Sequence, residues 1–223
     1  MSRNSHLTRA LIALVVGTGV LIAPAGFAAP RPACNLVTDP SGDVIGSAPG
    51  VDNGDYDIRS ADIATDSRKL TAVIRLSSLA AESPTSPAAR DYEFDFNANG
   101  HTFGLMANLL IGGASFEAVV YDTTAAGGRN GTDLGTISGV VDSARHEIRM
   151  TAPLSLFRPY ASFKQTYIDQ LTVGSARAVG HDATTTPDGR GSIGAQSVAI
   201  VVDDATSSTR YTPGRANCVR VGK

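Results

Sequence analysis

The sequence predicts an all-β protein, an antiparallel two-sheet β-sandwich of the jelly-roll or immunoglobulin-like kind. Three observations predict it. Apolar and polar residues alternate in many short segments, turn residues separate these segments at regular intervals, and no run of 12 or more residues has helical periodicity. Alternation is typical of antiparallel strands that bury one face, and about seven to ten such strands suit a sandwich.

The clearest hairpin lies near the middle of the chain. In residues 91–96 (DYEFDF), three aromatic residues alternate with three acidic ones, so we expect the rings on a buried face and the carboxylates on an outer face. The dipeptide Asn99–Gly100 favours a tight hairpin turn, and residues 101–106 supply the returning strand.

Further strands are expected on both sides of this hairpin, at residues 58–64, 70–76, 115–122, 135–141, 146–151, 170–179 and 197–202. One short helical turn is expected near residues 153–160 (PLSLFRPY). Pro153 suits the first position of a helix, and Pro159 would end it. Since no internal repeat or linker interrupts these segments, we expect one domain.

The first 28 residues have the pattern of a cleaved signal peptide. Arg3 and Arg9 precede an apolar stretch at residues 10–22, which is too short to span a bilayer of about 30 Å. Small residues at Gly26 and Ala28 then suit cleavage after Ala28. We therefore expect a secreted protein whose residues 29–223 form a single β-sandwich domain without membrane insertion. An uncleaved N-terminal membrane anchor is the alternative.

The composition narrows the classes of function. The 223 residues include 42% hydrophobic and 18% charged residues, which argues against intrinsic disorder. Nineteen basic residues stand against 21 acidic ones, giving a formal net charge of -2. A nucleic-acid-binding protein would normally carry a basic stripe, so no nucleic acid is expected as a partner.

The chain has two cysteines, Cys34 and Cys218. In an oxidising extracellular environment an even number of cysteines indicates a disulfide, which here would join the first and last segments of the domain. A redox-active pair or a metal–thiolate site is the alternative, but these sites usually have a close CxxC spacing.

Seven aspartates lie between residues 39 and 66, among glycine and asparagine residues. Closely spaced short carboxylates with glycines for tight turns allow several oxygens to converge on Ca²⁺. The glutamate that ends an EF-hand loop is missing, and the alternative is that these aspartates simply favour turns. The candidate Ca²⁺ ligands are Asp43, Asp55, Asp57 and Asp62.

A second acidic group, Asp91, Glu93 and Asp95, follows one face of the predicted strand 91–96. Paired carboxylates serve as catalysts in glycoside hydrolysis, so a secreted glycan-acting hydrolase using Glu93 and Asp95 is an alternative function. A solvated outer face is the more usual role of such a row. No serine-hydrolase, zinc-protease or nucleotide-binding motif is found.

Residues 54–63 (GDYDIRSADI), the strand 70–76 and the segment 139–142 (GVVD) resemble secreted β-sandwiches of the DOMON and family-9 carbohydrate-binding-module-like group. The resemblance implies a two-sheet sandwich and structural Ca²⁺ at the acidic entry. The partner is unknown, and an extracellular or cell-surface glycan is the candidate. The chain has no Trp, the residue on which such modules usually stack sugars. The best-supported expectation is an exported, non-enzymatic binding or structural domain.

Overall fold

The structure is a computed structural model that describes residues 34–44, 53–80, 89–110, 112–122, 130–164, 166–179, 183–185, 191–193, 198–215 and 218–221. All of them belong to the compact unit Pro32–Lys223. The expected signal peptide, residues 1–28, lies outside the described residues. Within these ranges, no helix has both the length and the apolar character needed to cross a membrane.

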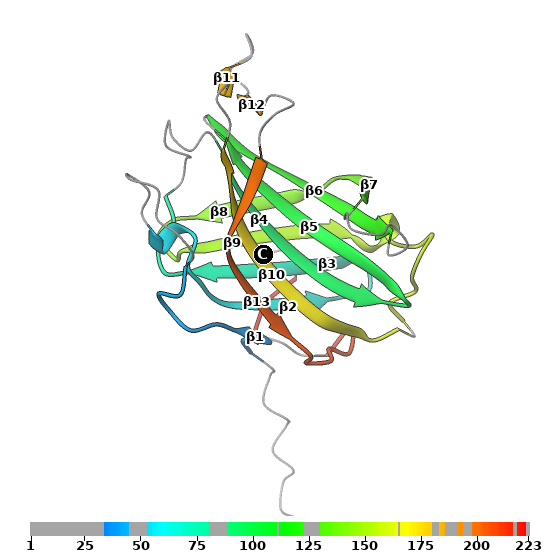
Figure 1. Ribbon diagram of the computed structural model, residues 1–223. Helices are drawn as coiled ribbons and strands as arrows, with labels where there is room; N and C mark the ends of the chain where they lie inside the picture. Colours follow the sequence, from blue (N-terminus) through cyan, green and yellow to red (C-terminus); the bar gives the residue numbers. More distant parts are fainter. Residues whose placement is uncertain are drawn as a thin grey trace, which may run out of the picture. The chain divides into compact units, whose positions relative to one another are not determined.

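Two antiparallel sheets form the sandwich, which confirms the predicted fold class (Figure 1). The five-stranded sheet contains, in spatial order, β1 (Val37–Thr38), β2 (Ile58–Thr65), β3 (Lys69–Leu76), β9 (Glu147–Pro153) and β8 (Ser138–Asp142). The six-stranded sheet contains β13 (Val198–Ser207), β10 (Ile168–Val179), β4 (Ala89–Ala98), β5 (His101–Leu110), β6 (Gly113–Asp122) and β7 (Asn130–Thr136). A separate short hairpin joins β11 (Ala183–Thr185) to β12 (Gly191–Ile193).

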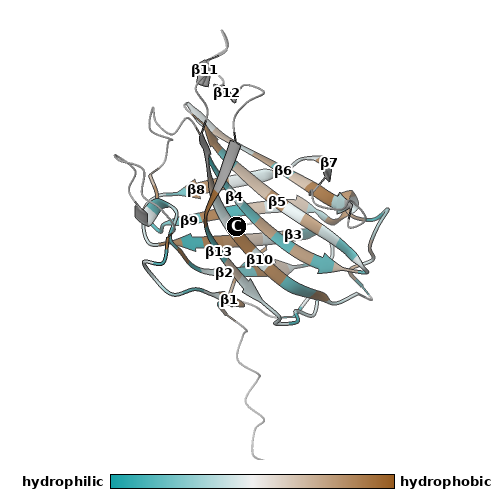
Figure 2. Cartoon of the chain, in the orientation of Figure 1, coloured by the Kyte–Doolittle hydropathy of each residue, from teal (hydrophilic) through white to brown (hydrophobic). Residues whose placement is uncertain are grey.

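The core lies between the sheets. Apolar and polar residues alternate along the strands (Figure 2), so that the apolar side chains of both sheets face the core. The aromatic residues of β4 are at most 1% exposed, as the sequence predicts. Phe96 and Phe103 pack with Phe157 and Phe163, and the ring centroids of these four residues lie 5.3–6.5 Å apart. Each fully buried Phe side chain contributes about 1.5–3 kcal/mol to stability.

The predicted turn between β4 and β5 is confirmed. Asn99 has φ of 54° and Gly100 has φ of 79°, and Ala98 pairs with His101. Positive φ at both central residues defines the type I′ turn, whose twist matches that of the paired strands.

The predicted single strand at residues 135–141 is wrong. The chain leaves the six-stranded sheet after β7, passes through Ile137 and enters the five-stranded sheet as β8. Ile137 is only 7% exposed and joins the core. Because both halves alternate in hydrophobicity, the sequence pattern does not reveal that the chain changes sheets.

The helical turn predicted near residues 153–160 is a 3₁₀ helix, η2 (Leu154–Leu156). The sequence predicts Pro153 as the first residue of this helix. In the structure Pro153 is instead the last residue of β9 and the N-cap of η2, with extended φ and ψ of -69° and 133°. A second 3₁₀ helix, η1 (Asn53–Asp55), precedes β2.

The C-terminal segment crosses the outer face of the five-stranded sheet. Cys218 is disulfide-bonded to Cys34, and their Cα atoms are 5.4 Å apart, as in ordinary disulfides. Val219 packs against Ala64 of β2 and Val73 of β3, which form a small apolar cluster outside the main core. The predicted pairing of the two cysteines is therefore present.

Candidate metal site

Three aspartates converge where the edges of the two sheets meet. Asp39 follows β1, Asp43 follows the turn at residues 41–42, and Asp203 lies in β13. One carboxylate oxygen from each lies within 4.8 Å of the others. Strand β1 is at one edge of the five-stranded sheet and β13 at one edge of the six-stranded sheet. The sandwich thus brings together residues that are far apart in the sequence.

Asp203 is held by the neighbouring sheet. Its Oδ2 accepts a hydrogen bond of 2.7 Å from the backbone N–H of Ile58 at the start of β2. The residue is only 4% exposed, although it follows an apolar run in an edge strand. This hydrogen bond links the buried carboxylate of β13 to the first residue of β2.

Asp57 organises the turn that carries Asp43. Its two carboxylate oxygens accept hydrogen bonds of 3.2 and 3.1 Å from the backbone N–H of Gly42. Its Oδ2 also accepts a hydrogen bond of 2.6 Å from Ser77 Oγ. Asp57 lies close enough to Asp39 and Asp203 for its charge to raise the pKa of both.

Asp39, Asp43, Asp203 and the neighbouring Asp57 form a cluster of four aspartates. The electrostatics of this cluster favour a bound positive charge. The pKa of Asp39 is raised to about 7. The largest cause is burial, followed by the charges of Asp203 and Asp43, a hydrogen bond with Asp203 and the charge of Asp57. Burial also raises the pKa of Asp203. Asp39 Oδ2 is buried and has no hydrogen-bond partner, and no Lys or Arg in the described part of the chain forms an ion pair with the four aspartates.

Asp55 lies apart from this cluster and is paired with an arginine. It forms a buried ion pair with Arg90 and accepts hydrogen bonds from Ser78 Oγ at 2.9 Å and the backbone N–H of Ala80 at 3.1 Å. The side chains of Asp55 and Arg90 are 9% and 1% exposed. The guanidinium thus supplies the positive charge that this carboxylate needs.

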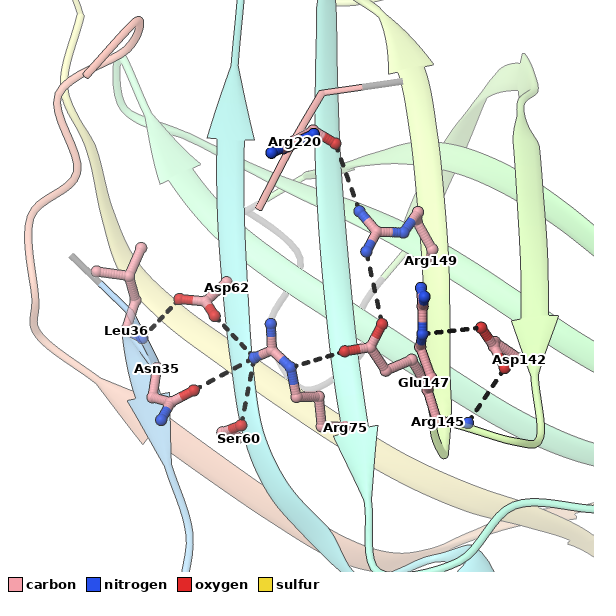
Figure 3. Close-up of polar contacts among 10 residues, drawn as sticks. All are labelled: Asn35, Leu36, Ser60, Asp62, Arg75, Asp142, Arg145, Glu147, Arg149 and Arg220. Atoms are coloured by element: carbon pink, nitrogen blue, oxygen red, sulfur yellow. Dashed lines mark hydrogen bonds and ion pairs between the residues drawn. The ribbon is translucent and has the colours of Figure 1, made fainter. Parts of the chain in front are cut away.

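Asp62 also has an arginine partner, on the outer face of the five-stranded sheet (Figure 3). Its Oδ2 lies 2.7 Å from Arg75 Nη1, and its Oδ1 accepts a hydrogen bond from the backbone N–H of Leu36. Arg75 also pairs with Glu147. Of the four predicted ligands, the structure therefore brings Asp43 and Asp57 to the acidic cluster, whereas Asp55 and Asp62 contact arginines.

The sequence does not predict Asp203 as a ligand, because nothing in a single sequence places β13 beside the loop after β1. Asp39 belongs to the acidic segment 39–66 but is not one of the four predicted ligands. The available signal for Asp203 is its position directly after the apolar residues 198–202, where an acidic residue interrupts a strand. That signal indicates that Asp203 has a particular role, but it does not identify Asp39 and Asp43 as its neighbours in space.

The carboxylates of β4 have a different environment. Burial and the charges of Glu117 and Glu93 raise the pKa of Asp91 to about 6. Glu93 accepts a hydrogen bond from the hydroxyl of Tyr121. Asp95 is only 3% exposed, so the pair Glu93 and Asp95 does not present two open carboxylates on the outer face.

These observations define the protein as a disulfide-linked, antiparallel two-sheet β-sandwich with an acidic cluster at one edge. The chain matches no protein-family model, no curated protein and no solved structure. Its function is therefore inferred from the site itself.

Proposed function

We propose that the protein is an exported, non-enzymatic binding or structural domain in which a bound Ca²⁺ ion holds the segment after β1 against β13. The observation that carries this proposal is the convergence of Asp39, Asp43 and Asp203, with ligand atoms within 4.8 Å of one another. Two oxygens on opposite sides of one Ca²⁺ ion, each at about 2.4 Å, are about 4.8 Å apart. One ion could therefore contact all three carboxylates.

The chemistry of the ligands favours Ca²⁺. It is a hard cation that accepts six to eight oxygen ligands in irregular arrangements, whereas Mg²⁺ requires near-octahedral geometry. A divalent ion would relieve the repulsion that raises the pKa of Asp39 and Asp203. It would also provide a partner for the buried Oδ2 of Asp39.

Two features of the chain support export. The first 28 residues have the signal-peptide pattern, and the disulfide between Cys34 and Cys218 suits an oxidising compartment. The resemblance to DOMON and family-9 carbohydrate-binding-module-like domains supports structural Ca²⁺ in the acidic entry.

Thermal unfolding with excess Ca²⁺ and with a chelator tests the proposal. Ca²⁺ at about 100 times its dissociation constant should stabilise the protein by about 2.7 kcal/mol, and so raise Tm by roughly 5–11 °C. Asp43→Asn should abolish this shift without harming the fold, because Asp43 is exposed.

Asp204→Asn is the matched control. It removes the same charge from the next residue after Asp203, and Asp204 is exposed and lies outside the cluster. This variant should retain the Ca²⁺ shift. The proposal is wrong if the parent protein shows no shift, or if Asp43→Asn retains it in full.

A further inference from the structure

A hollow of about 500 Å³ opens on the outer face of the five-stranded sheet. Strands β8 and β9 form its floor, and the C-terminal segment at residues 218–221 forms one wall. Figure 3 shows Arg220 of this segment beside Arg149 of β9. Such a volume falls within the range of about 300–1,000 Å³ that is typical of small-molecule sites. The lining residues are Val140, Asp142, Arg145, Glu147, Arg149, Cys218 and Arg220.

The two acidic residues of the hollow are already engaged. Glu147 pairs with Arg75, whose Nε is 3.0 Å away, and with Arg149, whose Nη2 is 3.5 Å away. Asp142 accepts a 3.1 Å hydrogen bond from the backbone N–H of Arg145, and its other oxygen lies 3.8 Å from Arg145 Nε. Both carboxylates thus already lie beside arginines: Glu147 beside Arg75 and Arg149, and Asp142 beside Arg145.

The arginines retain unused hydrogen-bond donors. Among the described residues, the one partner of Arg149 Nη1 is the carbonyl oxygen of Arg220, which accepts a long hydrogen bond of 3.4 Å. The side chain of Arg145 is 73% exposed, and the guanidinium of Arg220 has no partner among the residues that the structure describes. Since each guanidinium carries five N–H donors, donors exceed acceptors around the hollow.

We propose that this hollow binds a compact extracellular ligand through an oxyanion group: a carboxylate, sulfate or phosphate. Arginine suits these groups because its planar donors match pairs of anionic oxygens. Val140, which is 58% exposed, provides an apolar contact for the body of the ligand on the floor of the hollow. The site is separate from the acidic cluster and does not depend on Ca²⁺.

The disulfide contributes to this site. Cys218 lines the hollow, and Arg220 follows it by two residues. The bond to Cys34 and the packing of Val219 against Ala64 and Val73 hold this wall on the sheet. The C-terminal segment thereby carries Arg220 to β9, which supplies Arg149.

Isothermal titration calorimetry of the disulfide-bonded protein at low ionic strength tests the inference, with digalacturonate and sodium sulfate as separate probes. We expect saturable binding of at least one probe at one site per chain. Binding of both would indicate recognition of the free oxyanion, and binding of digalacturonate alone would indicate a sugar acid.

Arg220→Gln should weaken the observed binding about tenfold, the effect of losing one hydrogen bond between charged groups. Arg158→Gln is the matched control, because Arg158 is exposed and does not line the hollow. The inference is overturned if neither probe binds, if Arg220→Gln binds normally, or if Arg158→Gln weakens binding equally.

Discussion

The substitution Asp55→Asn separates the structural aspartates from the metal-binding ones. Asp55 lies in the acidic segment that predicts Ca²⁺ binding, but its carboxylate is paired with Arg90 inside the protein. The two side chains are 9% and 1% exposed, so neither charge is well solvated. Asn at this position can still accept the hydrogen bonds from Ser78 and Ala80. The main change is therefore an unpaired, buried guanidinium.

Removing one partner of a buried ion pair destabilises a protein by about 3–5 kcal/mol. At about 2–4 °C per kcal/mol for a domain of this size, Tm should fall by roughly 6–20 °C. The assay is thermal unfolding of the parent protein and of Asp55→Asn, each with and without Ca²⁺. The variant should show the lower Tm in both conditions and the same rise in Tm on addition of Ca²⁺ as the parent.

Asp43→Asn should give the opposite pattern. Its Tm in chelator should equal or exceed that of the parent, because the variant removes a charge that repels Asp39 and Asp203, and its Tm should not rise with Ca²⁺. The assignment of Asp55 to Arg90 is refuted if Asp55→Asn keeps the parent Tm in chelator. It is also refuted if this variant loses the Ca²⁺ response while retaining its metal-free stability.

Three other properties should follow from the structure. In metal-free protein the pKa of Asp39 is raised from 3.8 to about 7, so the folded state holds a proton that the unfolded state loses. The resulting stabilisation is complete below about pH 4 and is lost as the pH rises through about 7. Because Ca²⁺ binding requires the ionised carboxylate, the rise in Tm with Ca²⁺ should be larger at about pH 8 than at about pH 5. Replacing Cys34 and Cys218 by Ser opens a link between residues 184 apart, and should lower the free energy of unfolding in denaturant melts by up to roughly 5 kcal/mol. Gly100→Ala, at φ of 79°, should cost about 1 kcal/mol in the same melts, and an unchanged midpoint would contradict the type I′ turn.

The sequence predicts the local features of this fold well. Alternation identifies the strand pairs β2–β3 and β4–β5, and Asn99–Gly100 identifies the turn of the second pair. These features depend on neighbouring residues, whose pattern a single sequence displays. The change of sheet at Ile137 was missed, because it depends on which strand each half pairs with.

For the candidate metal site, too, the sequence predicts local features but not contacts between distant segments. The sequence places the acidic residues in one segment, but the partner of each depends on distant strands. Arg90 of β4 engages Asp55, and Arg75 of β3 engages Asp62. Asp203 of β13 joins Asp39 and Asp43. Long-range pairing therefore decides which carboxylates have a positive partner and which are left together.

Calorimetric titration of metal-free protein with Ca²⁺ tests the central claim most directly. We predict one Ca²⁺ ion bound per chain, with binding abolished in Asp203→Asn, which can still accept the hydrogen bond from Ile58, and retained in Asp204→Asn. Absence of binding by the parent protein, or full binding by Asp203→Asn, would contradict the account.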